Sequence, residues 1–149
     1  MTKQLTLVAL VICIAGSVSA AQTPKTRTYI DGRSAADTAA TPFSGAVLVG
    51  DTLYLSGQLG ASANAKPDTA EAEAKAALDK FQATLVKAGM TMDDLVSVTI
   101  YCPDVANYAA FNTVYRTYFK KEFPARAFIG SGPLLFGARF EVQGIAVKR

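Results

Sequence analysis

Two side chains near the end of the 149-residue chain have the chemistry to act together on a small molecule: Arg126 and Glu141. Arg126 lies in the segment 123–128 and Glu141 in the segment 139–147, and both segments are typical of short β-strands. An arginine holds a small carboxylate or phosphate through two parallel hydrogen bonds, and a nearby carboxylate can position or activate a water molecule. The pair therefore indicates a site for a small acid.

The chain contains no histidine, the side chain that most often serves as an acid, a base or a metal ligand. Chemistry must then rely on arginine, carboxylates, hydroxyls and backbone groups. Ser56 also lacks the histidine partner that would make it a nucleophile. These observations argue against a protease and against a metalloenzyme.

Residues 1–20 are predicted to form a cleavable export signal. Lys3 supplies the positive charge, residues 5–16 form an apolar run too short to span a bilayer comfortably, and small residues up to Ala20 provide the cleavage site. A buried N-terminal helix or an uncleaved anchor is the alternative. Cleavage predicts a periplasmic or secreted protein that has no membrane contact afterwards.

Removal of residues 1–20 leaves 129 residues, of which 14 are basic and 12 acidic, so the net charge is +2. A chain of this length fits one domain, and its weak charge gives no basic patch, so nucleic acid is not expected as a partner. Cys102 is the one cysteine that remains, which rules out an intrachain disulfide. Its place at the end of an apolar strand indicates inert packing.

A polar lead-in over residues 21–40 is predicted to precede the folded domain over residues 41–149. Strands are expected at 28–30, 45–49, 52–56, 96–102, 125–129 and 139–147, and helices between 68 and 89 and between 105 and 120. Asp68 as the N-cap, with Glu71 three residues later, predicts the start of the first helix. The two residues 50–51 predict a tight hairpin.

Apolar side chains recur at helical spacing in both helices, so each helix has one face for a core. These side chains are Ala74, Leu78, Phe81 and Leu85 in the first helix and Tyr108, Phe111, Tyr115 and Tyr118 in the second. The prediction is an α+β fold in which both helices pack on one face of a mixed sheet. Nothing is left to cover the opposite face, which predicts self-association.

Four segments occur in the order and spacing of a known family. They are Gly50-Asp51-Thr52-Leu53-Tyr54-Leu55-Ser56-Gly57-Gln58, Phe111-Asn112-Thr113-Val114-Tyr115, Phe123-Pro124-Ala125-Arg126 and Phe140-Glu141-Val142-Gln143-Gly144-Ile145-Ala146-Val147. Through them the chain resembles the RidA/YjgF family of enamine/imine deaminases, formerly called L-PSP endoribonucleases, over residues 40–149. The Pro-Ala-Arg and Glu-x-x-x-Ile-Ala-Val segments are the most specific.

The resemblance implies a chorismate-mutase-like domain that forms a homotrimer with active sites between subunits and uses no cofactor or metal. It implies that Arg126 binds the substrate carboxylate and that Glu141 positions the attacking water. It also implies that Ser56, Gly57 and Asn112 line the same pocket.

Two positions depart from the family pattern. Phe43 stands where the family usually carries a tyrosine, so a hydroxyl is missing. Phe128 stands two residues after the arginine, where the family often has cysteine or another small residue. Both are candidates for substrate binding, and the ring of Phe128 is expected to narrow or reshape the pocket if it enters the cleft.

The function implied is hydrolysis of 2-iminobutanoate- or 2-iminopropanoate-type compounds to 2-oxo acids and ammonia by an exported enzyme. Two alternatives share the fold: a non-catalytic module that binds small carboxylates or regulates, and a chaperone-like interaction protein. Turnover requires Glu141, whereas carboxylate capture mainly requires Arg126, and a chaperone would tolerate the loss of Arg126. Ribonuclease activity is not favoured, because the sequence has no basic stripe.

Overall fold

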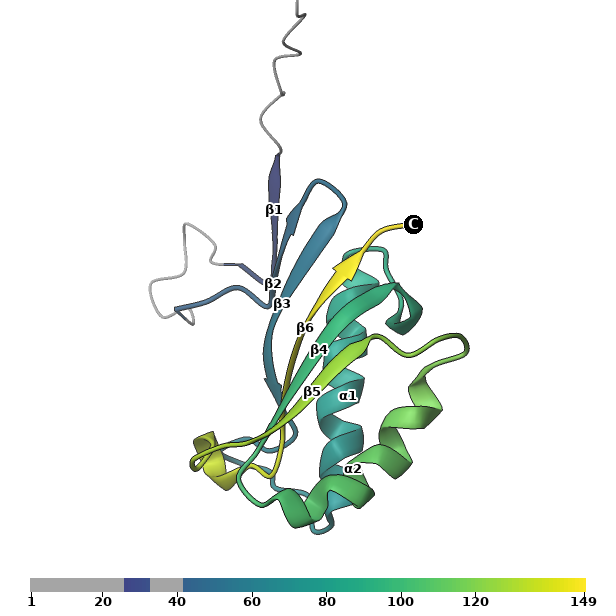
Figure 1. The fold of residues 1–149 in the computed structure, drawn as a ribbon. Helices are drawn as coiled ribbons and strands as arrows, with labels where there is room; N and C mark the ends of the chain where they lie inside the picture. Colours follow the sequence, from purple (N-terminus) through teal and green to yellow (C-terminus); the bar gives the residue numbers. More distant parts are fainter. Residues whose placement is uncertain (1–25, 33–41) are drawn as a thin grey trace, which may run out of the picture.

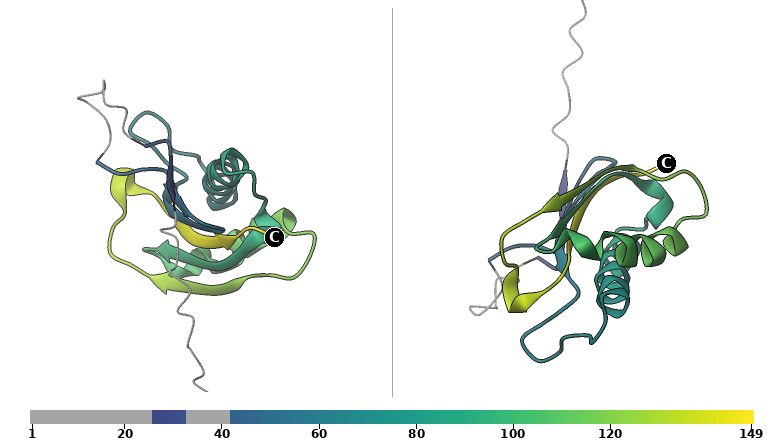
Figure 2. Two further views of the ribbon diagram at one scale, coloured as in Figure 1. Left: turned by 90° about the horizontal axis from the view of Figure 1, so that it is seen from above. Right: turned by 60° about the horizontal axis from the view of Figure 1, so that its bottom comes forward.

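The computed structural model describes residues 26–32 and 42–149, and in them a six-stranded mixed sheet carries two helices on one face (Figures 1 and 2). The strands are β1 Arg27–Ile30, β2 Ala46–Val49, β3 Thr52–Leu59, β4 Leu95–Cys102, β5 Ala125–Gly130 and β6 Glu141–Val147. Their order across the sheet is β1-β2-β3-β6-β4-β5. All neighbouring strands are antiparallel except β4 and β5, which are parallel. The predicted α+β fold class is confirmed.

The predicted early strands are present. The strand expected at 28–30 is β1, which pairs with β2, so the sheet begins within the lead-in. The predicted signal and most of the lead-in lie outside the described residues. β2 and β3 form the predicted hairpin, in which Gly50 takes a positive φ of 59° while Asp51 does not. A positive φ at the first of two turn residues is the requirement of a type II′ turn.

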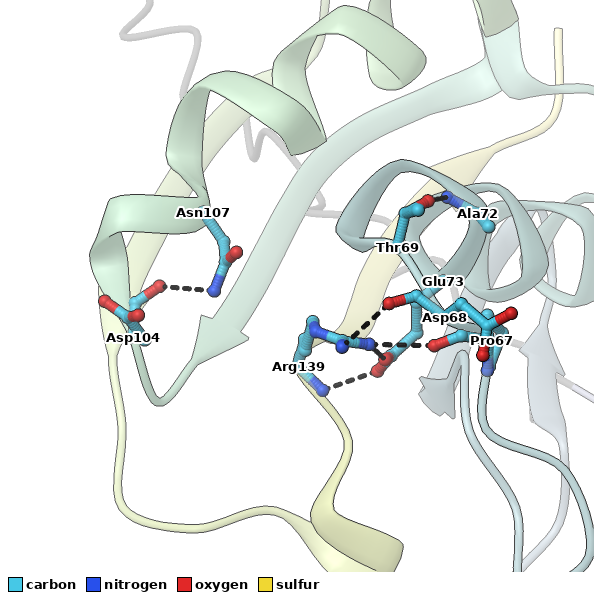
Figure 3. Close-up of polar contacts among 8 residues, drawn as sticks. All are labelled: Pro67, Asp68, Thr69, Ala72, Glu73, Asp104, Asn107 and Arg139. Atoms are coloured by element: carbon cyan, nitrogen blue, oxygen red, sulfur yellow. Dashed lines mark hydrogen bonds and ion pairs between the residues drawn. The ribbon is translucent and has the colours of Figure 1, made fainter.

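Helix α1 spans Ala70–Lys87 and packs on the sheet through the predicted apolar side chains. The predicted N-cap, Asp68, is wrong by one residue, and so is the capping box with Glu71. Thr69 caps the helix instead, and its hydroxyl accepts a hydrogen bond from the Ala72 amide (3.1 Å, Figure 3). The helix ends where predicted, because Gly89 has a positive φ of 72°, a conformation that terminates helices.

The second predicted helix consists of three pieces. A 3₁₀ turn, η2 Val105–Asn107, leads into helix α2 Tyr108–Tyr115, and a further 3₁₀ turn, η3 Arg116–Tyr118, follows. The first turn starts at Asp104, whose side chain accepts from the Ala106 amide. Thr117 at the far end donates its hydroxyl to the Val114 carbonyl three residues earlier. Side chains that bond the nearby backbone in this way favour short turns over a continued α-helix.

Strand β4 differs from its predicted pattern at its start. Val96 was expected to alternate with Val98 toward the core, yet it is 47% exposed, while Leu95 is buried. The cause is a register shift between Leu95 and Ser97 in the pairing with β6. Such a bulge adds one residue to a strand and turns the extra side chain outward.

The sheet has a helix face and an open face. Val98, Ile100, Val142 and Ala146 point to the helix face and are buried under α1 and α2. The residues that alternate with them belong to the open face, where Tyr54 is exposed. Figure 2 shows both helices on the same side of the sheet. No helix of the described residues is long and apolar enough to cross a membrane.

An ion pair clamps the start of α1 to the start of β6 (Figure 3). Glu73 is 0% exposed, and its carboxylate accepts from both the Arg139 amide and the Arg139 guanidinium (2.7 Å). The same guanidinium donates to the carbonyls of Pro67 (2.9 Å) and Asp68 (3.1 Å). The clamp therefore fixes the chain two residues before Glu141.

Removal of the arginine side of this clamp should destabilise the fold. Arg139→Met leaves the Glu73 carboxylate buried without its cation, and breaking a buried pair in this way costs about 3 kcal/mol of unfolding free energy. Urea unfolding followed by circular dichroism measures it. Lys75→Met is the matched control, because it breaks the exposed Lys75–Asp79 pair and should cost only ~0–1 kcal/mol. Equal losses in the two variants would contradict the structural role of the clamp.

Candidate active site

Arg126 points to the helix face of β5, the strand at one edge of the sheet. It pairs in register with Val98, which is buried on that face, and register partners share a face. Its guanidinium carbon lies 4.7 Å from the centre of the Tyr115 ring and 5.8 Å from that of Tyr108. Cation–π contacts of this kind hold the guanidinium against α2.

A pocket of about 260 Å³ opens in front of this arginine. The residues that line it are Tyr108, Asn112, Tyr115, Arg116, Phe123, Pro124 and Arg126. Asn112 is 9% exposed, and no hydrogen bond joins its side chain to any described residue. Arg126 likewise has no carboxylate partner in the part of the chain that the structure describes. The structure thus brings together two of the predicted site residues, Arg126 and Asn112, and neither side chain is hydrogen-bonded to a described residue.

Tyr115 contributes a polar group that sequence reasoning assigned only to the core. The residue is 3% exposed, and its hydroxyl has no hydrogen-bond partner among the described residues. Burial raises the pKa of Tyr115 to about 12, although the nearby Arg126 charge acts in the opposite direction. Tyr108 was also expected in the core, yet it is 48% exposed. The sequence spacing could have indicated that both tyrosines lie at the pocket, because they are three or four residues from Asn112 and so share its helix face.

Phe128 lies beside the pocket and is not among the residues that line it. Its ring meets Tyr108 edge-on, with centroids 5.0 Å apart, and lies 5.8 Å from Phe111. In this chain the ring therefore fills space behind Tyr108 and supports the tyrosine that faces Arg126.

Glu141 belongs to the open face. It alternates with the buried Val142 and pairs in register with Tyr101 and Leu59. Gly57 lies directly beneath its carboxylate, since a β-carbon at position 57 would overlap Glu141 Oε1. Any larger residue at position 57 would displace the Glu141 carboxylate from this position.

Two more predicted residues are tied to this neighbourhood by the backbone. The Ser56 hydroxyl donates to the Ser44 carbonyl (2.7 Å), which anchors the segment that carries Phe43 beside the bulge in β3. Phe43 itself is exposed. The predicted site residues thus form two groups: Arg126, Asn112 and Phe128 on the helix face, and Glu141, Gly57, Ser56 and Phe43 toward the other side.

One chain does not bring the two groups together. β6 and β5 are separated by β4, which places Glu141 and Arg126 at least ~10 Å apart across the strands. The sheet itself also lies between them, because they point to opposite faces. A site that used both side chains on one small molecule would require two copies of the chain.

Two further observations concern metals and thiols. Over residues 26–32 and 42–149, no cluster of three acidic or cysteine side chains is arranged to hold a metal ion. Cys102 is buried, and its thiol donates to the Asp104 carbonyl (3.0 Å). Burial raises the pKa of this thiol, so the prediction that it packs inertly agrees with its environment.

The chain is similar in sequence and in fold to proteins of one known family. The family model described as Endoribonuclease L-PSP matches residues 33–148, most of the chain. The protein belongs to the RidA/YjgF family.

Similar curated proteins include the 2-iminobutanoate/2-iminopropanoate deaminases of Capra hircus and Homo sapiens. They are 41% and 36% identical to the chain over 110 residues, which cover 72% of it and 80% of each relative. Among solved structures, RidA from an Antarctic Psychrobacter is 29% identical with a TM-score of 0.67, covering 73% of this chain and 90% of that one. A Rid family protein of Yersinia pestis is 29% identical with a TM-score of 0.71, covering 82% and 99%. The expected family and its fold are therefore confirmed.

The buried hydroxyl of Tyr115 predicts a late-titrating tyrosine. Its folded pKa of about 12 lies above the ordinary value of 10, so the unfolded chain loses this proton first as the pH rises. The folded state should therefore lose stability between about pH 10 and pH 12, by about 3 kcal/mol in all, and none through this group below pH 10. Absorbance titration at 295 nm, with Tyr115→Phe subtracted, should isolate the transition. A difference curve centred near pH 10 would contradict the assignment.

Proposed function

We propose that this RidA/YjgF protein is an exported, homotrimeric deaminase that hydrolyses 2-imino acids, of the 2-iminobutanoate or 2-iminopropanoate type, to 2-oxo acids and ammonium. The observation that carries the proposal is the Arg126 pocket, where the guanidinium is held against two tyrosine rings and pairs with no carboxylate of residues 26–32 and 42–149. The relatives named as deaminases of these compounds support the choice of reaction.

Binding starts from the carboxylate of the substrate. Arg126 offers two parallel N–H groups that match its two oxygens, and Asn112 offers an amide at the same pocket wall. The cation–π contacts restrict the guanidinium before substrate arrives, so less side-chain entropy is lost on binding. The iminium carbon, next to the carboxylate, then lies at a defined place in the pocket.

The chemical step requires one water molecule. Glu141 accepts a proton from this water as its oxygen forms a bond to the iminium carbon, giving a tetrahedral carbinolamine. Glu141 then returns this proton to the nitrogen, which leaves as ammonia when the C–N bond breaks. The carbinolamine hydroxyl gives its proton to the ammonia as the C=O bond forms, so the products are the 2-oxo acid and ammonium. Holding water and substrate together can remove several kcal/mol of the barrier, at most roughly 7–11. General-base assistance adds about 10²–10⁴-fold.

Association of copies follows from the positions of the two groups. Arg126 of one copy and Glu141 of another can face one substrate, whereas the two within one chain point away from each other across the sheet. The open face supports association, because it presents the exposed side chains of Tyr54 and Val147 without a helix over them. A homotrimer would then hold three such sites.

The direct test is turnover by residues 21–149. An amino-acid oxidase or a dehydratase generates the imino acid in situ, and release of 2-oxo acid and loss of the imine are followed. We expect Arg126→Ala to lower kcat/KM at least ~100-fold and Glu141→Gln to lower kcat by ~10²–10⁴-fold. Binding of 2-oxobutanoate should persist in Glu141→Gln and be lost in Arg126→Ala. Binding without turnover in the wild type would instead assign the protein to the carboxylate-binding class.

Mixing the two inactive variants tests whether the site is shared between copies. Arg126→Ala and Glu141→Gln are unfolded together and refolded as a mixture. In random oligomers about a quarter of the sites then combine an intact arginine with an intact glutamate, so about a quarter of wild-type activity should return. Each variant refolded alone is the control. No recovery, despite mixed oligomers shown by mass spectrometry, would mean that both residues serve from the same copy.

Export is tested separately. Expressed in full in a Gram-negative host, the protein should appear outside the cytoplasm with Ala21 or Gln22 as its first residue, because cleavage is expected after Ala20 or Ala21. Fractionation and intact mass measure this. Replacing Val8 and Leu10 with arginine interrupts the apolar run and should leave the uncleaved chain in the cytoplasm. A wild-type chain that retains residues 1–20 would contradict the export proposal.

A further inference from the structure

The pocket in front of Arg126 contains a second guanidinium, that of Arg116. Arg116 directly follows α2 and lies four residues after Asn112 and eight after Tyr108. That spacing places all three on one side of the helical segment. The two arginines therefore reach one cavity of about 260 Å³ from different elements, one from the sheet edge and one from the helix end.

No carboxylate of the described residues neutralises either of these two arginines. Four other cations of the described chain have a carboxylate within 4.0 Å: Lys75, Lys87, Arg139 and Arg149. Arg116 and Arg126 have none among the described residues. Two like charges at one partly apolar cavity repel each other, and an anion between them would remove the repulsion.

Two uncharged polar groups lie in the same cavity without partners among the described residues. Asn112 and Tyr115 are both more than nine-tenths buried, and the Tyr115 hydroxyl has no hydrogen bond. A buried polar group without a partner is costly in a native structure and points to a ligand or water that is bound there in use. Aromatic walls from Tyr108 and Phe123 suit the carbon chain of such a ligand.

We infer that the preferred substrates are 2-imino acids with a second carboxylate at the far end of the side chain, such as those formed by oxidation of acidic amino acids. This inference rests on the proposed function and names the substrate class of its site. Arg126 binds the carboxylate next to the reacting carbon, and Arg116 binds the distal one. The Tyr115 hydroxyl and the Asn112 amide donate to the same ligand.

A purely structural role for Arg116 makes a different prediction. A cation at the C-terminal end of a helix interacts favourably with the helix dipole and so stabilises the helix. Loss of that contribution would lower stability and affect all ligands alike. Selectivity between two acids that differ only in the distal carboxylate separates the two roles.

The experiment compares two five-carbon ligands by titration calorimetry on residues 21–149: 2-oxoglutarate and 2-oxopentanoate. We expect the wild type to bind 2-oxoglutarate at least ~10-fold more tightly, since hydrogen bonds to charged groups contribute enough for that factor. Arg116→Gln should bring this ratio close to one. Lys121→Gln removes the same charge from an exposed position outside the pocket and should keep the ratio. Equal affinities in the wild type, or an unchanged ratio in Arg116→Gln, would overturn the inference.

Turnover separates this inference from the proposed function. The imines of glutamate and norvaline are generated in situ, and Arg116→Gln should raise KM for the glutamate imine about 10-fold more than for the norvaline imine. Turnover of both imines without such a difference would overturn the inference and leave the deaminase proposal standing. Selective 2-oxoglutarate binding that depends on Arg116, but without any turnover, would support the ligand class and refute the deaminase.

Discussion

The alternation of side chains along each strand is the constraint on which the site depends. Helices cover one face of the sheet, so every second strand residue enters the core and the others face outward. The Arg126 and Glu141 side chains point to opposite faces of the sheet, and β4 lies between the two strands that carry them. Moving either side chain to the other face would require a one-residue slip that exposes a row of core residues. A site that used both side chains on one ligand would therefore need a second copy of the chain.

Aromatic packing restricts the Arg126 side chain, which would otherwise be flexible, to one position. Phe128 supports Tyr108, and Tyr108 and Tyr115 together hold the guanidinium of Arg126. An arginine without such support samples many rotamers, and ordering it on binding would weaken affinity. On the other face, Gly57 gives Glu141 room, while the Glu73–Arg139 clamp fixes the chain just before it. Arg126 and Glu141 are thus each positioned by the residues packed around them.

Local patterns predicted the elements well and their details less well. The apolar stripe of α1, the β2–β3 hairpin and the two last strands follow from periodicity and turn residues. The N-cap moved from Asp68 to Thr69 because either residue is a good cap and tertiary contacts choose between them. Val96 was misplaced because a bulge depends on the partner strand. Residue chemistry singled out Arg126 and Glu141, and the resemblance supplied their expected roles. Helix spacing places Tyr115 and Arg116 on the same side as Asn112, but only the packing of α2 against β5 makes that side the wall of a pocket.

The position of β6 in the sheet has a consequence for the order in which the chain folds. The last strand in the sequence is a central strand of the sheet, hydrogen-bonded to β3 on one side and β4 on the other. Without β6, the β1–β3 ribbon and the β4–β5 pair have no strand that joins them, so the sheet is incomplete. The complete sheet can therefore form only after β6 has been synthesised.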